Sequence, residues 1–419
     1  MRSKQFLGFV SRGFAVVAVS VILASGVWAA SKEKVLYAFT GANNGLNQAA
    51  LLAFDSSGNA YGTTAEGGTA GLGTVFKLTP HSNGKWTETV LHNFSGGSDG
   101  KAPHGGVTLY KGSLYGTAVA GGSGGACTGD GCGTVFKLTR SGSSFSVLYN
   151  FTGGKDGFGP GGGVVFDKKG NLYGTTPDGG KANGCAGQGC GVVYQLAPTK
   201  GGGWREKAIH TFTGGSDGAT GSLGLLHFDK AGNIYGAAEL GGDKICGCGT
   251  IFKLSATSTG RWRFSRLYAF TGTPDGNSSY GGLIADATGS LYGTTYFGGA
   301  NGQGSVFQLT RGSNGKWTNT ILYSFQGSTD GGNPTSTLIF DANGNLYGTA
   351  TAGGANGDGV VFKLTHGFGG FTQSVVHDFG PSPDGSIPFY GLVRHAGKLY
   401  STTSSGGRNG GGIVFEITP

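Results

Sequence analysis

Charged residues are scarce in this chain. Asp, Glu, Lys and Arg make up 12% of its 419 residues, about half the usual share of roughly 25%. The formal net charge of +8 is spread along the chain, with no basic stripe and no recognition helix. We therefore expect no nucleic-acid binding, and solubility must come from Ser, Thr, Asn and exposed backbone.

Motifs of the common catalytic classes are also missing. No Gly-x-Ser-x-Gly elbow stands at a strand-to-helix turn, and no helix is predicted that would support one. The glycine-rich loops are not phosphate loops, because no helix follows them. From the sequence we assign no catalytic residue, no metal ligand and no cofactor, and we favour a non-enzymatic protein over an enzyme.

Long apolar runs are absent beyond the N-terminus. There, basic residues precede an apolar stretch at residues 14–27, and small residues follow it. This pattern is typical of a secretory signal peptide, here residues 1–29, with a mature chain that begins at Ala30. The apolar stretch is too short for a comfortable membrane span. We expect an exported monomer, periplasmic or secreted, with no membrane span in the mature chain.

Glycine, in contrast, is abundant. The chain has 90 glycines, roughly three times the usual share of about 7%. They fall at fixed places in a repeat whose central phrase, Leu-Tyr-Gly-Thr-Thr, is closed by a Gly-Gly pair. The tyrosines of the seven copies are Tyr61, Tyr115, Tyr173, Tyr235, Tyr292, Tyr347 and Tyr400. They lie 54, 58, 62, 57, 55 and 53 residues apart, a period typical of a propeller.

Each repeat contains four strand-like segments, named A to D. In the third repeat they are residues 163–167, 172–176, 191–196 and 208–212, separated by turns with Asp, Gly and Asn. A large aromatic residue recurs at one place in every C and D segment, as expected where one sheet packs on the next. We predict an all-β fold: a seven-bladed β-propeller of four-stranded blades in one domain, residues 30–419.

The two ends of the mature chain carry incomplete repeats. Residues 35–39 form a D segment with no A, B or C before it, and residues 413–417 form a C segment with no D after it. An open propeller would expose strand edges on both terminal blades. We therefore expect the N-terminal strand to pair with the last C strand and to close blade 7.

Several polar and aromatic residues recur at fixed places and invite a functional interpretation. An Asp or Asn precedes Gly in every D–A loop: Asn44, Asp99, Asp156, Asp217, Asp275, Asp330 and Asp384. A ring of cation ligands is one interpretation, but each loop offers a single carboxylate, and we favour a turn-stabilising role. His92, His210 and His377 stand at a D-segment position that is Tyr in the other repeats. We therefore expect these histidines to be part of the repeat rather than to bind a metal ion.

Four tryptophans recur in the same manner. Trp86, Trp204, Trp262 and Trp317 stand at the start of D segments, at the face away from the expected ligand site. They could stack on sugars, but recurrence at one slot favours a packing role.

All six cysteines lie in B–C loops of blades 2, 3 and 4, and these are the longest B–C loops of the chain. In an exported protein, Cys127–Cys132 and Cys185–Cys190 are expected as local disulfides. The pairing of Cys246 with Cys248 stays open, because a bridge two residues apart would be strained. A zinc site is the competing interpretation, which the lack of nearby His disfavours. We expect blades 2–4 to form an elaborated sector of the ligand face.

The D–A and B–C loops should emerge together around the mouth of the central channel, the default ligand site of this fold. The non-repeated residues there that we name as binding candidates are Glu66, His104, Asp178, Glu239 and Tyr296. Because they are scattered over several blades, we favour non-catalytic binding of a glycan or an extracytoplasmic protein. The alternative is an extracytoplasmic lyase or hydrolase, acting on polysaccharide or lactone through Glu66, Asp178 or Glu239.

The repeat unit also resembles a known family. It runs Leu-Tyr-x-Phe-Thr-Gly-Gly-x-Asp-Gly, then Gly-Asn-Leu-Tyr-Gly-Thr-Thr-x-x-Gly-Gly, then Gly-Thr-Val-Phe-Lys-Leu-Thr. This resembles the GloVer (Gloeo/Verruco) tandem repeat of exported bacterial proteins of the choice-of-anchor type, over residues 35–418. The resemblance implies a surface or secreted location, and no established activity or catalytic residue. Those proteins are named for C-terminal anchors, and this chain shows none, which favours a periplasmic or released protein.

Overall fold

A computed structural model of the chain describes residues 32–41, 43–48, 51–125, 127, 129–180, 185 and 188–419. These residues belong to one compact unit, Ser31–Pro419. The predicted signal peptide, residues 1–29, lies outside the described residues. All named elements of the described chain are β-strands, and none of its segments is a helix long and apolar enough to cross a membrane.

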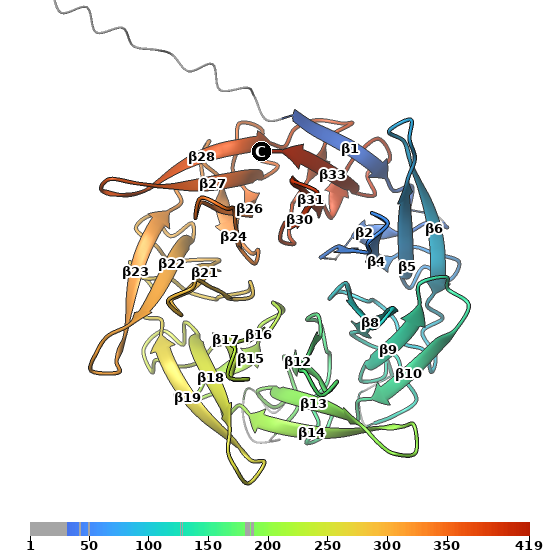
Figure 1. The fold of residues 1–419 in the computed structure, drawn as a ribbon, viewed down its shortest axis with the longest axis horizontal. Helices are drawn as coiled ribbons and strands as arrows, with labels where there is room; N and C mark the ends of the chain where they lie inside the picture. Colours follow the sequence, from blue (N-terminus) through green and yellow to red (C-terminus); the bar gives the residue numbers. More distant parts are fainter. Residues whose placement is uncertain are drawn as a thin grey trace, which may run out of the picture. The chain divides into compact units, whose positions relative to one another are not determined.

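The strands form seven small antiparallel sheets arranged in a ring, as Figure 1 shows, so the fold is the predicted seven-bladed β-propeller. Blade 1 contains β2 (Leu46–Gln48), β3 (Ala53–Phe54), β4 (Ala60–Glu66), β5 (Thr74–Pro80) and β6 (Trp86–Asn93). Blade 2 contains β7 (Val107–Tyr110), β8 (Ser113–Ala118), β9 (Thr134–Thr139) and β10 (Phe145–Asn150). Blade 3 contains β11 (Val165–Phe166), β12 (Leu172–Thr176), β13 (Val192–Pro198) and β14 (Trp204–Thr211).

The second half of the ring repeats this order. Blade 4 contains β15 (Ala219–Gly221), β16 (His227–Phe228), β17 (Ile234–Leu240), β18 (Thr250–Ala256) and β19 (Trp262–Ala269). Blade 5 contains β20 (Ile284–Ala285), β21 (Leu291–Thr295), β22 (Ser305–Arg311) and β23 (Trp317–Ser324). Blade 6 contains β24 (Gly332–Pro334), β25 (Ile339–Phe340), β26 (Leu346–Ala352), β27 (Val360–Gly367) and β28 (Gly370–Asp378). Blade 7 contains β29 (Gly385–Ser386), β30 (Val393–His395), β31 (Lys398–Thr402), β32 (Ser405–Gly406), β33 (Ile413–Thr418) and β1 (Lys32–Ala38).

The ring closes through its N-terminal strand. β1 pairs antiparallel with β33 from Lys32 opposite Thr418 to Ala38 opposite Ile413, with a register shift between Val35 and Tyr37. β33 in turn pairs with β31, and β31 with β30. Blade 7 is therefore built from both ends of the described chain, which confirms the predicted closure.

Three blades contain one strand more than the four predicted. In blades 1, 4 and 6 a further short strand precedes the predicted A strand and pairs with the same B strand, as β15 precedes β16 beside β17. The chain between these two short strands packs against neighbouring blades instead of a ladder partner. A Cβ placed on Gly224 would lie 2.0 Å from the Gly282 backbone nitrogen of blade 5. The backbones touch there, which only glycine permits.

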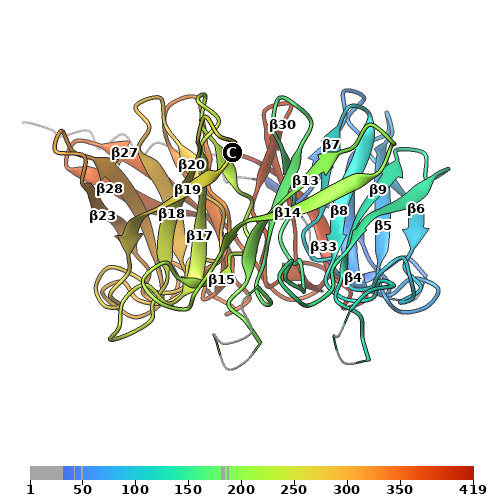
Figure 2. The same ribbon diagram turned by 90° about the horizontal axis from the view of Figure 1, so that it is seen from below.

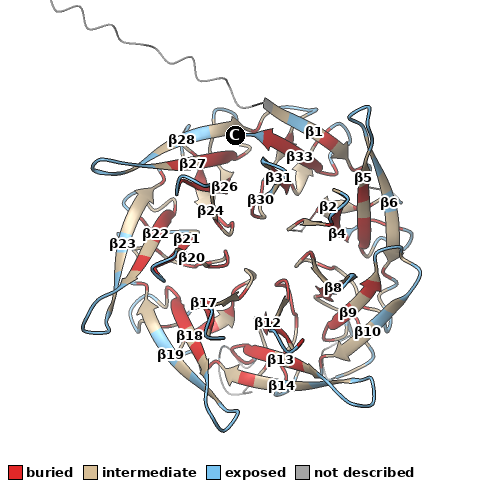
Figure 3. Ribbon diagram, viewed as in Figure 1, coloured by how far each residue is buried: buried red, intermediate tan, exposed pale blue. Residues whose placement is uncertain are grey.

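The core lies between the blades and in their middle strands. Figure 3 shows the C strands, such as β5 and β13, as the most buried part of each sheet and the outer strands as more exposed. The recurring aromatic residues predicted for packing are fully buried, among them Phe76, Phe136, Tyr194, Phe252 and Phe307. Phe39 contacts Phe76 edge to face at 5.1 Å, and the equivalent pair recurs as Phe270 with Phe307 at 5.2 Å. These rings join one blade to the next.

The Asp-Gly residues of the D–A loops stabilise their own turns. Asp156 accepts hydrogen bonds from the Thr152 backbone N–H at 2.8 Å and from the Tyr149 hydroxyl at 2.9 Å. Corresponding slot pairs are His92 with Asp99, His210 with Asp217, Tyr268 with Asp275, Tyr323 with Asp330 and His377 with Asp384. The carboxylates are thus occupied within their loops, in agreement with the turn-stabilising role predicted for them.

Candidate functional site

Among the described residues, a small cavity lies at the axis of the ring. It measures about 30 Å³ and is lined by residues of all seven blades, among them Gly105, Leu223, Tyr280 and Phe389. That volume holds a water molecule or two, whereas a small-molecule site typically needs roughly 300–1,000 Å³. This cavity is therefore too small for such a ligand, and the rim around it is the candidate site.

The D–A and B–C loops form that rim together, at one end of the upright blades seen in Figure 2. Single backbone bridges join the two loops within one blade, as between Lys101 and Ala120 and between Phe158 and Asp178. Side chains from both loops can therefore meet at the rim.

Asp178 and Glu239 are neighbours there, although they come from different blades. Asp178 follows β12, and Glu239 lies near the end of β17 with only 8% of its surface exposed. Burial, then the Asp178 charge, raises the pKa of Glu239 to about 8, while a hydrogen bond from the Leu223 backbone acts in the opposite direction. Burial also raises the pKa of Asp178. At neutral pH the Glu239 carboxyl is therefore largely protonated beside a second carboxyl.

Two tyrosines continue this group into blade 5. The ring centroids of Tyr280 and Tyr296 are 5.2 Å apart in an edge-to-face arrangement. Burial, and then the negative charge of Glu239, raises the pKa of Tyr280. We define the rim cluster as Asp178, Glu239, Tyr280 and Tyr296. It combines hydrogen-bonding carboxyls with aromatic faces at one edge of the axial cavity.

Exposed apolar side chains lie on the same two B–C loops. Leu240 next to Glu239 is 48% exposed, and Phe297 next to Tyr296 is 46% exposed. Ile245, in the disulfide-bearing loop of blade 4, is 96% exposed. Single exposed apolar residues are common, but the Phe297 ring contacts that of Tyr296 at 4.5 Å and so adjoins the polar cluster.

The other two predicted binding residues lie in blades 1 and 2, separate from the rim cluster. Glu66 is exposed at the end of β4, where Asn47 donates a hydrogen bond to it at 3.5 Å. Burial lowers the pKa of His104, while the Glu66 charge opposes this shift. The structure thus brings Asp178, Glu239 and Tyr296 together and leaves Glu66 with His104 as a smaller pair.

The repeat explains how this cluster arises. Glu239 and Tyr296 occupy the same place, four residues after the repeated tyrosine, where the other blades carry Ala65, Val119, Pro177, Thr351 and Ser404. Tyr280, the fourth member of the cluster, was not among the five candidates named from the sequence. In blade 4, the segment from Thr220 to Leu226 is one residue longer than its blade 5 counterpart from Ser278 to Leu283. The extra residue distinguishes, already in the sequence, the segment whose Leu223 backbone N–H donates a hydrogen bond to Glu239.

Larger hollows exist at the opposite end of the blades. One of about 450 Å³ lies between blades 1 and 2 and is lined by Asp55, Tyr61, Lys77 and Arg140. Another of about 250 Å³ lies between blades 6 and 7, where Asp341, Tyr347 and Lys363 take the corresponding places. Asp55, Tyr61 and Lys77 occupy repeated positions, and the Tyr61 hydroxyl already bonds Asp55 at 2.9 Å. Arg140 forms an ion pair with Asp55 at 3.3 Å, so we assign all four residues to blade packing.

All six cysteines are paired. The disulfides are Cys127–Cys132, Cys185–Cys190 and Cys246–Cys248. The first two confirm the prediction, and the third settles the pairing that the sequence left open. Three disulfides are compatible with an extracytoplasmic protein.

The tryptophans at the starts of the D strands pack within the fold. Trp262 contacts Tyr173 of the preceding blade at 5.9 Å, and Trp86 contacts Tyr400 at 6.5 Å, both edge to face. This supports the packing role over a sugar-binding one. Within the described chain, the residues spaced to hold a metal ion are Glu33, His377 and Asp384, on the outer strands and a loop of blades 6 and 7.

Three solved structures illustrate the remote similarity of this chain to known proteins. A gluconolactonase from Xanthomonas campestris matches with 13% identity and a TM-score of 0.39, over 68% of this chain and 78% of that one. A protein of unknown function from Dyadobacter fermentans has 10% identity and a TM-score of 0.46, over 93% and 98%. A puromycin-hydrolysing peptidase from Mycobacterium tuberculosis has 10% identity and a TM-score of 0.49, over 87% and 50%. No curated protein matches the sequence.

The repeat that builds the blades is the feature with a clear relative. A family model described as the Gloeobacter/Verrucomicrobia repeat matches residues 27–247 and again residues 226–419. The two matches together span the whole described propeller, including the strand that closes it. The chain therefore belongs to the Gloeobacter/Verrucomicrobia repeat family.

Proposed function

We propose that this protein is an exported propeller that binds a saccharide at the rim cluster, as a monomer and without catalysis. The observation that carries the proposal is the meeting of Asp178, Glu239, Tyr280 and Tyr296, from three adjacent blades, at one edge of the axial cavity. Glu239 and Tyr296 are the departures from the small residues found at their place in most other blades.

The chemistry of the cluster suits a sugar. Carboxyl groups form hydrogen bonds with hydroxyls, and a protonated Glu239 can donate as well as accept. Aromatic faces such as those of Tyr280 and Tyr296 cover the C–H surfaces of a pyranose ring, and Phe297 beside Tyr296 adds a further apolar surface. Because the site contains two carboxyls, we expect neutral or amino sugars to bind and uronic acids to be repelled.

The first test is thermal melting of the purified, oxidised chain with neutral, amino and acidic oligosaccharides. We expect neutral or amino sugars to raise the melting temperature in a concentration-dependent manner, and polyuronates to have no effect. In Tyr296→Ala and Asp178→Asn the sugar-dependent rise should be lost, while Glu66→Gln, on the same face in blade 1, should keep it.

Each other outcome counts against the proposal. A rise that persists in Tyr296→Ala and Asp178→Asn would place binding elsewhere. No rise with any sugar, together with a rise on addition of an extracytoplasmic protein, would replace the saccharide with a protein partner. A preference for polyuronates would contradict the role given to the carboxyls.

A specific observation also favours a second function, an extracytoplasmic hydrolase or lyase. A carboxyl with a pKa raised to about 8 beside a second acid is the arrangement by which a general acid stays protonated at neutral pH. Glu239→Gln distinguishes the two functions, because glutamine still forms hydrogen bonds but transfers no proton. Sugar release by the native chain that Glu239→Gln abolishes without loss of binding would establish the enzyme, and binding without release supports the non-catalytic function.

Export is part of the same proposal. It rests on the charge and hydropathy pattern of residues 1–29 and on three disulfides. N-terminal sequencing of the protein from the periplasm or medium should begin at Ala30. Recovery of the intact chain in the cytoplasm with reduced cysteines would contradict it.

A further inference from the structure

The outer D strand of each blade contacts the D strand of the next blade along a seam, and the seven seams share one arrangement. In each seam, the recurring His or Tyr of one D strand faces a residue of the next D strand. That residue lies four positions before the recurring His or Tyr of its own strand. We call this facing residue the seam residue. The seven seam residues are Glu33, Glu88, Phe145, Glu206, Phe264, Asn319 and Gln373.

The three histidines at this position have different neighbours. His92 stacks on Phe145 with ring centroids 3.8 Å apart, and His210 stacks on Phe264 at 4.0 Å. An aromatic cap therefore covers each of these imidazoles. The third, His377, faces Glu33 instead, at the seam where the N-terminal strand closes the ring.

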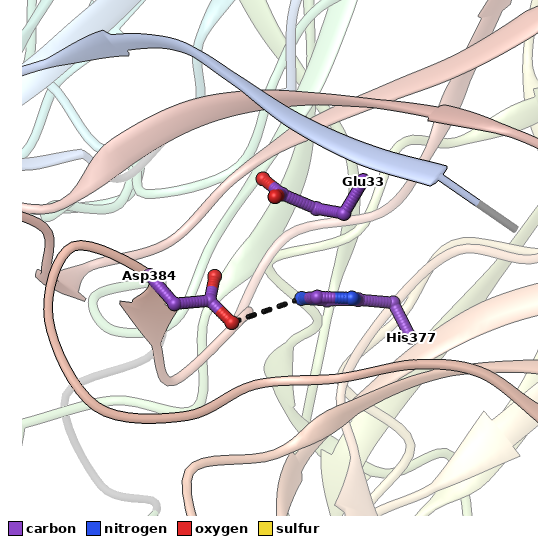
Figure 4. A group of neighbouring side chains, drawn as sticks. All are labelled: Glu33, His377 and Asp384. Atoms are coloured by element: carbon purple, nitrogen blue, oxygen red, sulfur yellow. Dashed lines mark hydrogen bonds and ion pairs between the residues drawn. The ribbon is translucent and has the colours of Figure 1, made fainter.

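Figure 4 shows the resulting group of Glu33, His377 and Asp384. His377 Nε2 lies 3.0 Å from Asp384 Oδ2, and one ligand atom from each of the three residues lies within 4.8 Å of the others. Asp384 is held in place by the backbone N–H groups of Gly380 at 3.1 Å and Gly385 at 2.7 Å.

Of these three residues, Glu33 is the one with an unsatisfied hydrogen-bond acceptor. Its Oε1 is buried and has no hydrogen-bond partner among the described residues. The same oxygen is also unpartnered in the seam residues Glu88 and Glu206. Glu33 differs from them because it faces an imidazole as well as a second carboxyl, a combination of donors that a bound cation would satisfy.

We propose that Glu33, His377 and Asp384 bind a divalent first-row transition metal ion, Zn²⁺ or a similar ion, at the closing seam of the ring. One imidazole nitrogen and two carboxylate oxygens form a donor set that Zn²⁺ accepts, with water in the remaining position. The imidazole favours transition metals over Ca²⁺, which prefers six to eight oxygens. The two carboxylate charges balance the ion.

Binding requires a defined local change. The ion takes the Nε2 lone pair, so the ring proton of neutral His377 must lie on Nδ1. Protons held by Glu33 or between Nε2 and Asp384 leave to solvent. The three ligand atoms must also approach to about 3.3 Å of one another, as bonds of about 2.0–2.2 Å at a tetrahedral ion require. The unpartnered oxygen of Glu33 is the group available to make this move.

The consequence is structural. Glu33 belongs to β1, while His377 belongs to β28 and Asp384 to the loop that follows it. An ion shared by them ties the N-terminal strand to blade 6, in addition to the β1–β33 ladder of blade 7. Metal should therefore stabilise the closed ring and protect β1 from fraying.

The chain itself supplies the test variants. Glu33→Phe recreates the aromatic cap seen on His92 and His210, so it should fold without metal, and Glu33→Gln removes the charge alone. Glu206→Gln is the matched control, because Glu206 is a seam residue that faces Tyr149 and Asp156 and has no imidazole beside it. Titration calorimetry and thermal melting with Zn²⁺, Mn²⁺ and Ca²⁺ on the metal-stripped full chain give the readouts.

We expect one Zn²⁺ per chain, a raised melting temperature, weaker binding of Mn²⁺ and no effect of Ca²⁺. Affinity should fall at least tenfold in Glu33→Gln and vanish in Glu33→Phe, while Glu206→Gln binds as the native chain does. Absence of Zn²⁺ binding by the native chain would overturn the proposal. So would equal Zn²⁺ binding by Glu33→Phe, which would assign the ion to another site.

Discussion

At the residue scale, the buried carboxyl of Glu239 couples the rim cluster to pH. Its pKa of about 8 in the folded chain, against an ordinary value of 4.5, means that the folded state keeps a proton that the unfolded state loses above about pH 4.5. Stability therefore decreases as pH rises from about 4.5 to about 8, and this group adds no further change above that range.

This gives a first prediction. In Glu239→Gln, the decrease in unfolding free energy between pH 5 and 8 should be smaller than in the native chain, by up to about 1.4 kcal/mol per pH unit. Urea unfolding at pH 5, 6, 7 and 8 measures it. Glu206→Gln is a useful comparison, because the pKa of Glu206 is raised to about 7 and its effect should end one pH unit lower. Identical pH profiles for Glu239→Gln and the native chain would contradict the prediction.

A second residue-scale feature is a left-handed backbone position in each D–A loop. It is occupied by Asn47, Ala102, Gly159, Thr220, Ser278, Asn333 and Ile387. Ile387 has a φ of 57°, and a β-branched residue is strained in that region by about 1–2 kcal/mol. It is also 42% exposed, so its side chain gains little from burial.

We therefore expect Ile387→Asn, which copies the residue of blades 1 and 6, to raise the unfolding free energy by about 1 kcal/mol. The reverse exchange, Asn333→Ile, should lower it, since it adds strain and removes the hydrogen bond from Asn333 Nδ2 to the Tyr296 carbonyl. Denaturant unfolding measures both. A less stable Ile387→Asn variant would show that Ile387 makes a contact more favourable than its strain.

At the scale of the strand, the glycine that follows the repeated tyrosine in blades 1 to 6 leaves space for the aromatic ring of the neighbouring C strand. A Cβ on Gly293 would lie 2.7 Å from Phe307 Cζ and 3.0 Å from Leu283 Cδ2. The aromatic ring of the C strand therefore fills the space that a side chain would need. In blade 7 the place is taken by Ser401, whose hydroxyl donates to the Gly391 carbonyl at 2.9 Å, so that blade packs differently.

Gly293→Ala should accordingly destabilise the protein by about 1–3 kcal/mol through overpacking. Gly201→Ala is the matched control, because a Cβ there meets nothing within 4 Å, and its effect should stay within about 0.5 kcal/mol. Chemical denaturation of the two variants distinguishes them. Equal effects would mean that the sheet adapts to the added methyl group.

At the scale of the whole molecule, the ring depends on β1 for closure. Removing residues 1–38 should expose the edge of β33, lower the melting temperature and promote aggregation. A synthetic peptide of residues 31–41 added in trans should restore the transition, because it can re-form the β1–β33 ladder. Circular dichroism melting with and without the peptide measures this. A truncated chain that melts as the native one does would show that the ladder contributes little.

The fold could be predicted from the sequence because each of its determinants is repeated. Seven tyrosines, seven Gly-Gly pairs and the complementary end segments specify blade number and closure. The rim cluster could be predicted only in part, because Asp178, Glu239 and Tyr296 are far apart in sequence and their proximity depends on how adjacent blades curve around the axis. The group of Glu33, His377 and Asp384 was missed, since His377 was interpreted through its repeat and its seam partner lies at the opposite end of the chain.

The measurement that tests the central claim most directly is titration calorimetry of the best-binding neutral or amino oligosaccharide. The rim cluster occurs once in a sevenfold repeat, so we predict one binding site per chain. The affinity of this site should fall at least tenfold in Tyr296→Ala and stay unchanged in Glu66→Gln. Several equivalent sites per chain, unaffected by Tyr296→Ala, would contradict it and would place binding on a repeated feature such as the tryptophans of the D strands.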